Sequence, residues 1–177
     1  MLTYFVLASP QHVTLTGNPP LLTYTPATNY FGPDGFTFQA NDGQVDSNLA
    51  TVSITIQRVF SFYGFDSPVD NQPIVNNAKA GSAIPVKWRI TELDGTPVSD
   101  LMSFKSLISY SVSCGSFSGD PVDELDEYSA GNSGLRYLGD GFWQFNWKTA
   151  KGYAGQCRIM VLKLADESEH TALFSFK

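Results

Sequence analysis

The chain has 177 residues, of which 42% are hydrophobic and 14% aromatic, with 15 glycines and 10 prolines. A chain of this length can bury one large or two small cores, and this composition, with few residues spaced for long helices, predicts an all-β fold. The formal net charge of -6 argues against nucleic acid as a partner, because a phosphate backbone requires clustered cations.

Five short strands are expected in the first part of the chain, over residues 2–7, 12–16, 21–25, 35–40 and 49–57. Apolar and polar residues alternate in each, as in Phe36 and Phe38 around Thr37, so one face of each strand points toward a core. Proline, glycine and asparagine lie between the strands, where turns require them. The pattern predicts antiparallel sheets.

This region contains LTYTP (22–26), NYFGPDGFTF (29–38), NDG (41–43) and ATVSITI (50–56). It resembles the cadherin-like, immunoglobulin-like (Ig-like) tandem repeat of large bacterial surface and secreted proteins. The resemblance implies an extracellular or cell-surface location. It covers only the later part of a repeat, so residues 1–58 are expected to form a partial module that lacks one edge. Unpaired backbone groups at that edge predict an edge-strand dimer.

The first eight residues read as a strand and not as an export signal, because no basic residue precedes their short apolar run. No apolar stretch reaches the roughly 18 residues of a membrane-spanning helix, so membrane insertion is not expected. An extracellular module without its own signal is most simply a part of a longer exported polypeptide.

A second module is expected over residues 59–177. It contains GFDSPVDN (64–71), KAGSAIPVKW (79–88), QCR (156–158) and HTALFSFK (170–177). These motifs resemble the family named for its PxKF motif, with Trp88 where that family usually has Phe. The resemblance implies an extracellular, β-rich module without an assigned activity.

The residues of this second module also predict a sandwich. Ile84, Val86, Trp88 and Ile90 alternate with other residue types, and residues 142–147 and 172–176 repeat the pattern. Their apolar faces must pack together to leave water. Residues 115–141 read instead as a long loop with one strand at 135–138. The predicted fold is therefore all-β, with two Ig-like antiparallel β-sandwich modules in tandem, the first incomplete.

Two cysteines, Cys114 and Cys157, lie in or beside strand-like segments. A disulfide would close a loop of about 43 residues and stabilise the fold by roughly 4 kcal/mol. The alternative is two buried free thiols.

Acidic residues suggest calcium as a cofactor, since hard cations take oxygen ligands. The densest cluster is Asp120, Asp123, Glu124, Asp126 and Glu127. A second candidate is Asp42 with Asp46, in a segment where an Asp-Gly pair also makes a hairpin turn. The alternatives are a solvated acidic loop and turn chemistry respectively.

Catalysis has few candidate residues, because the chain has only two histidines, His12 and His170. The segment GSFSG (115–119) places Phe117 where a nucleophile elbow needs serine. A calcium-dependent hydrolase of esters or lactones, acting through the acidic loop, is kept as an alternative to a protein without enzymatic activity, and its catalytic residues are unknown.

Aromatic residues offer a third function, carbohydrate binding. Trp143, Trp147 and Tyr137 can form a platform that stacks on sugar rings, although such residues are commonly part of a core. The main hypothesis is an extracellular segment of a bacterial surface or secreted repeat protein, with a role in adhesion, display or spacing and with a surface polysaccharide or another protein as partner.

Overall fold

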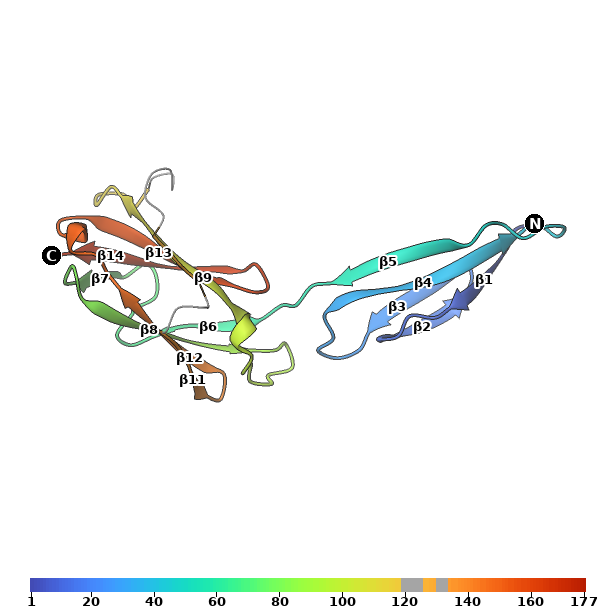
Figure 1. The fold of residues 1–177 in the computed structure, drawn as a ribbon, viewed down its shortest axis with the longest axis horizontal. Coiled ribbons are helices and arrows are strands. Elements are labelled where there is room, and N and C mark those ends of the chain that lie inside the picture. Colours follow the sequence, from blue (N-terminus) through green and yellow to red (C-terminus); the bar gives the residue numbers. More distant parts are fainter. Residues whose placement is uncertain (119–125, 130–133) are drawn as a thin grey trace. The chain divides into compact units, whose positions relative to one another are not determined.

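The computed structural model describes residues 1–118, 126–129 and 134–177. It divides into two compact units, Met1–Arg58 (unit 1) and Val59–Lys177 (unit 2). Strands make up most of both, and the helical segments among the described residues are single 3-10 turns at Leu101–Ser103 and Lys151–Tyr153 (Figure 1). The prediction of an all-β fold with antiparallel sheets is confirmed.

Unit 1 contains the five strands that the alternation predicted. They are β1 (Thr3–Ala8), β2 (Val13–Asn18), β3 (Leu21–Pro26), β4 (Gly32–Asn41) and β5 (Ala50–Ile56). One sheet has the order β1-β4-β5, and β2 pairs with β3 in a second, two-stranded sheet. All of these pairings are antiparallel.

The central strand β4 begins before the predicted residue 35 and includes a proline. Pro33 pairs with Thr55 of β5, whereas the pairing of β4 with β1 begins only at Thr37. Proline lacks a backbone N–H and is tolerated where a neighbouring strand is absent. The strand therefore extends through Pro33 because its β1 side is unpaired there.

Unit 1 has no buried residue, since all of its 58 residues are half-buried or exposed. An apolar groove of about 360 Å³ lies among Tyr4, Val6, Leu22, Phe36 and Phe38, which come from both sheets. The inner faces of the two sheets thus remain accessible to water, consistent with an incomplete sandwich.

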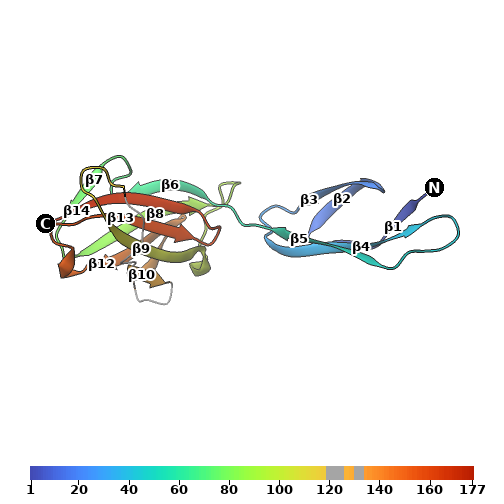
Figure 2. The same cartoon turned by 90° about the horizontal axis from the view of Figure 1, so that it is seen from above.

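Unit 2 has two larger sheets, which form two layers (Figures 1 and 2). The four-stranded sheet has the order β11-β12-β8-β6, and the five-stranded sheet has the order β10-β9-β13-β14-β7. The strands are β6 (Ser61–Asp66), β7 (Val75–Ala78), β8 (Ala83–Thr91), β9 (Phe104–Val112), β10 (Asp126–Ser129), β11 (Leu135–Gly139), β12 (Phe142–Lys148), β13 (Cys157–Leu164) and β14 (Glu169–Phe176). Neighbours are antiparallel except β14 and β7, which are parallel.

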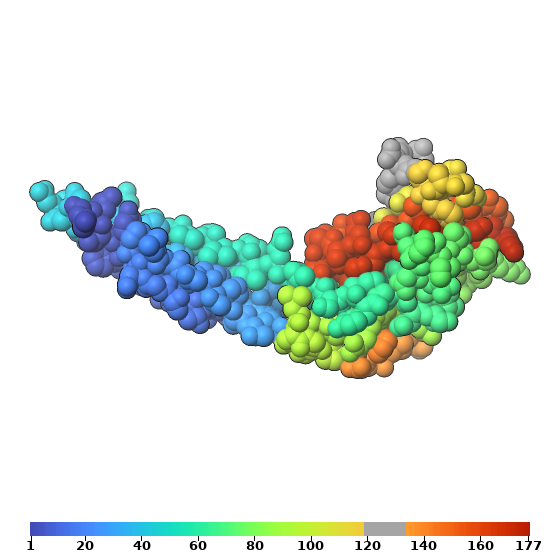
Figure 3. Space-filling view, turned by 180° about the vertical axis from the view of Figure 1, so that it is seen from behind, coloured from blue at the N-terminus to red at the C-terminus, as the bar shows by residue number. Residues whose placement is uncertain are grey.

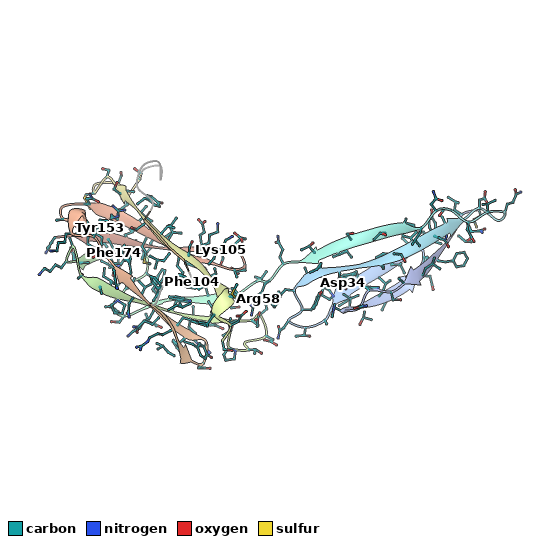
Figure 4. The ribbon with its side chains drawn as sticks, in the orientation of Figure 1. Asp34, Arg58, Phe104, Lys105, Tyr153 and Phe174 are labelled. Carbon is teal, nitrogen blue, oxygen red and sulfur yellow. A yellow bond between two sulfur atoms is a disulfide. The ribbon has the colours of Figure 1, made fainter. Side chains whose placement is uncertain are left out.

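The core of unit 2 lies between these sheets and is rich in aromatic side chains. Trp88, Trp143 and Trp147 are each 0% exposed. Phe174 of β14 meets the Trp147 ring edge-on, with 5.1 Å between ring centroids. Figure 4 shows Phe104 and Phe174 among the side chains between the layers. The predicted second sandwich is therefore present.

Residues 115–141 differ from the prediction of one long loop. The predicted strand near residues 135–138 is present as β11. The structure also has β10, which pairs with residues Ser106–Ser109 of β9. Acidic residues are depleted in strands, so the sequence of β10 favoured a loop over this edge position.

Candidate functional site

The two cysteines form a disulfide, as the first of the two alternatives predicted. The Cys114–Cys157 bond links the segment after β9 to the first residue of β13, with 5.0 Å between the Cα atoms. No described cysteine is free. The bond therefore joins two neighbouring strands of the five-stranded sheet and has a structural role.

The acidic cluster proposed for calcium lies mostly outside the described residues. Asp120, Asp123 and Glu124 fall in the segment 119–125, and Asp126 and Glu127 begin β10, where only the backbone pairing with β9 is described. Calcium binding by this cluster stays a prediction.

Asp42 and Asp46 are engaged in a turn. The Asp42 Oδ1 atom accepts hydrogen bonds from the backbone N–H groups of Gln44 and Val45, each at 2.9 Å. These two bonds lower the pKa of the Asp42 carboxyl. Asp46 Oδ1 accepts a bond of 2.7 Å from the Asn41 side chain. Within residues 1–118 and the other described ranges, no group of three or more acidic, histidine or cysteine side chains is arranged to hold a metal.

The prediction of an aromatic platform for sugar binding is wrong for Trp143 and Trp147. Trp143 and Trp147 are fully buried, because the face of β12 that carries them packs against the second sheet. Tyr137 is 38% exposed on the edge strand β11, and its hydroxyl accepts a bond from Gly141 N–H. Rings held inside a core cannot stack on a sugar.

His170 lies in a small polar cluster beside the hairpin between β13 and β14. Its ring stacks on Phe62 at 3.6 Å between centroids, and its Nε2 atom is 3.1 Å from Ser168 Oγ. The serine hydroxyl donates to Asp166 Oδ1, and Asp166 Oδ2 accepts from Phe60 N–H. Burial lowers the pKa of His170, against the opposing effect of the Asp166 charge.

This serine, histidine and aspartate set is not arranged as a nucleophilic triad. In a triad the carboxylate orients the histidine, whereas here the Asp166 carboxylate accepts hydrogen bonds from the hydroxyl and the backbone N–H of Ser168, within the hairpin. The other histidine, His12, stacks on Tyr30 at 4.1 Å between centroids. This geometry supplies no catalytic residues for the alternative of a calcium-dependent hydrolase, which stays a prediction.

Asp34 joins the two sheets of unit 1, a role that the sequence did not reveal. Its Oδ2 atom accepts a bond of 3.0 Å from the hydroxyl of Tyr24 on β3, and its carboxylate also accepts the N–H groups of Gln11 and Gly35 (Figure 4). Although desolvation acts to raise it, these bonds hold the pKa of Asp34 below its ordinary value. Burial and the bond to Asp34 raise the pKa of Tyr24 to about 12.

Arg158 is a second residue that sequence reasoning missed. It is 0% exposed on the inward side of β13, with its guanidinium carbon 3.9 Å from the centre of the Tyr153 ring. Its Nη2 atom donates to Ser109 O at 3.0 Å and its Nη1 atom to Gln156 Oε1 at 2.8 Å. The sequence contained a signal for this burial, because Arg158 alternates along β13 with the same spacing as Met160 and Leu162 and so lies on their side of the strand.

The outward side of the four-stranded sheet, here called the outer face, carries polar and basic side chains. One row crosses all four strands, because Lys87 pairs with Asp66 on one side and Gln144 on the other, and Gln144 pairs with Arg136. In the next row Arg89 pairs with Phe142. The alternation of Lys87 and Arg89 with buried Val86 and Trp88 was the sequence signal for this face.

Arg89 is fixed within the outer face. Its guanidinium carbon lies 4.9 Å from the centre of the Tyr63 ring and 5.5 Å from that of Phe142. Its Nε atom donates to Asp140 O at 2.9 Å, and its Nη2 atom is 3.4 Å from Asp140 Oδ2. By contrast, neither Lys87 nor Arg136 has an ion-pair or hydrogen-bond partner on its side chain within the described part of the chain.

In a comparison with protein families, residues 1–55 match the model of the bacterial Ig domain. Among curated proteins, the chain is 30% identical over 86 residues to integrin beta-like protein B of Dictyostelium discoideum. That match covers 49% of this chain and only 4% of the relative's length. The predicted Ig-like repeat in the first part of the chain is thus supported.

Solved structures give weaker likenesses. The adhesin InvE of Yersinia pseudotuberculosis aligns over 100% of this chain and 49% of its own, at 11% identity and a TM-score of 0.37. An endo-fucoidan hydrolase of glycoside hydrolase family 107 aligns over 99% of this chain and 23% of its own, at 19% identity and a TM-score of 0.28.

None of the described helical segments is long and apolar enough to cross a membrane.

Proposed function

We propose that this chain is an extracellular segment of a bacterial surface or secreted repeat protein, serving adhesion, display or spacing. The observation that carries the proposal is the match of residues 1–55 to the bacterial Ig domain model. The strands of this region and the sandwich of unit 2 supply the layered β modules that such repeat proteins join in series.

Two features of the chain support an extracellular setting. The Cys114–Cys157 disulfide is a bond that persists in oxidising compartments. The formal net charge of -6 favours solubility on an exposed module. Neither feature by itself names a partner.

Unit 2 is proposed to be a PxKF-type domain. Its support is the resemblance of residues 64–88 and 156–177 to that family, together with the observed sandwich. Trp88, which stands where the family usually has Phe, is 0% exposed and packs near Phe104 with 6.0 Å between ring centroids. Trp88 is thus part of the core of unit 2.

Location is tested on cells that produce the protein. Antibodies raised against the whole chain should label intact, unpermeabilised cells or the culture medium, and an external protease should remove the surface label. A cytoplasmic protein used as a marker must stay protected in the same cells. Labelling that appears only after permeabilisation contradicts the proposal.

A further inference from the structure

The outer face of the four-stranded sheet differs in charge from the rest of unit 2. Unit 2 has 14 acidic and 10 basic residues. Four of the basic residues lie on the outward side of this sheet, namely Lys87, Arg89, Arg136 and Lys148, whereas the acidic residues beside them are Asp66 and Asp140. The face is therefore a cationic surface on an anionic module, which favours anionic partners.

Two of these cations are available to a ligand. Lys87 and Arg136 lie in one row with Gln144 between them, so they are two strand spacings apart, roughly 10 Å. This separation is comparable to the repeat of a disaccharide in an extended polysaccharide. If every second sugar of such a polymer carries an anionic group, two of these groups can contact Lys87 and Arg136 at the same time.

The side chains between and beside the cations suit a flat, polar ligand. Gln144 Nε2 donates to Asn146 Oδ1 at 2.9 Å, which orders two planar amides on the face. The Tyr63 ring is 60% exposed and is held against Arg89. Planar amides and exposed tyrosine rings are the groups that bind hydroxyls and stack on sugar rings.

A peptide would need different features. Peptides commonly add a strand to a free sheet edge or insert side chains into pockets. On the outer face the central strands β8 and β12 are paired on both sides, so their backbone groups are engaged within the sheet. Recognition there depends on side chains spread over the surface of the sheet; Figure 3 shows the residues near 140, in orange, along the lower margin of unit 2.

We infer that the outer face of the β11-β12-β8-β6 sheet binds an anionic polysaccharide, with Lys87 and Arg136 contacting carboxylate or sulfate groups that lie two sugars apart. Arg89, Gln144 and Tyr63 position the sugar rings between them. The inference rests on the proposed extracellular role, in which such polymers are accessible, and it names the class of partner.

The test measures binding of the full chain to polygalacturonate, dextran sulfate, neutral dextran and poly-glutamate by titration calorimetry at low and physiological salt. The wild-type chain should bind at least one of the two anionic polysaccharides, more weakly at higher salt, and should not bind dextran. Binding to only one of them identifies the anionic group. Binding to neither, or equal binding to poly-glutamate, overturns the inference.

Matched double variants locate the site. The variant Lys87→Gln with Arg136→Gln should weaken binding at least about tenfold, because it removes two charge-assisted contacts. The control, Lys105→Gln with Lys163→Gln, removes the same charge from the outward side of the other sheet and should change affinity by less than about threefold. Equal losses in both would show attraction by net charge alone and would overturn the inference.

The binding test and the location test can fail independently of each other. A chain that labels intact cells but binds no anionic polysaccharide retains the proposed function and loses the inference. A chain that binds polygalacturonate yet stays in the cytoplasm retains the binding site and loses the proposed extracellular function. Melting curves of each variant, read from tryptophan fluorescence, verify that unit 2 remains folded.

Discussion

Units 1 and 2 are built from the same pattern of alternating strands, yet they differ in what the strands bury. Unit 2 encloses three tryptophans at 0% exposure between sheets of four and five strands. Unit 1 sets a two-stranded sheet beside a three-stranded one and buries no residue. A period-two pattern therefore specifies the face of a strand, whereas the number of strands in each layer decides whether that face leaves water.

The two units can be followed separately because all three tryptophans, Trp88, Trp143 and Trp147, belong to unit 2. Tryptophan fluorescence reports the unfolding of unit 2. Hydrogen exchange in peptides from residues 1–58 reports the opening of unit 1.

The largest expected difference between the units comes from truncating one phenylalanine in each. Phe174→Ala should destabilise unit 2 by about 3–5 kcal/mol, because the ring is 1% exposed. Phe38→Ala should cost unit 1 only about 1–2 kcal/mol, because its ring is half-buried. Urea unfolding with the two probes measures both, and equal losses would contradict the contrast in burial.

The disulfide should stabilise one unit alone. Replacing both Cys114 and Cys157 by alanine should lower the unfolding free energy of unit 2 by about 2–4 kcal/mol, since the open chain has more conformational freedom. Hydrogen exchange in unit 1 should not change. A loss in both units would show that they unfold cooperatively.

Calcium should also separate the units. The proposed cluster around Asp123 and Glu127 belongs to unit 2, and the carboxylates of Asp42 and Asp46 are engaged in a turn of unit 1. At ten times its dissociation constant calcium should raise the melting temperature of unit 2 by about 6 °C. An unchanged melting curve at millimolar calcium, after treatment with a chelator, would remove the metal from the proposal.

A smaller, pH-dependent effect is expected in unit 1. Because hydrogen bonds hold the pKa of Asp34 below that of an unfolded chain, about 3.9, its carboxylate stabilises unit 1 above that pH. The contribution is lost as the pH falls through the folded-state pKa. Asp34→Asn should remove this dependence in hydrogen-exchange measurements between pH 6 and 3, and an unaltered pH profile would contradict the role of Asp34.

The weakest expected effect is self-association through unit 1. Strand β1 has a free edge, its Phe5 and Leu7 residues are 52% and 58% exposed, and no Asp, Glu, Lys or Arg residue precedes Asp34. Such an edge favours pairing with a second chain. Light scattering should show concentration-dependent dimers that Phe5→Lys abolishes, and a monomer at all concentrations would contradict the prediction.

The sequence was sufficient to predict the fold class and most strands, because alternation is a local property. The alternation noted over residues 142–147 is present in β12, where Trp143, Phe145 and Trp147 share the buried side. Which side of the strand meets the second sheet depends on distant residues, so their availability to a sugar was predicted wrongly. For the same reason the roles of Asp34 and Arg158 were missed, since their partners Tyr24 and Ser109 lie 10 and 49 residues away.

The parallel pairing of β14 with β7 has a mechanical consequence. Four residue pairs, from Leu173 with Val75 to Phe176 with Ala78, join the two strands, and Lys177 exchanges backbone hydrogen bonds with Ala78 and Ala80. Tension applied at Lys177 runs along the axis of β14, so these bonds are loaded in shear and must break together rather than one after another. If the chain is stretched by flow, the paired strands β7 and β14 would therefore resist its extension.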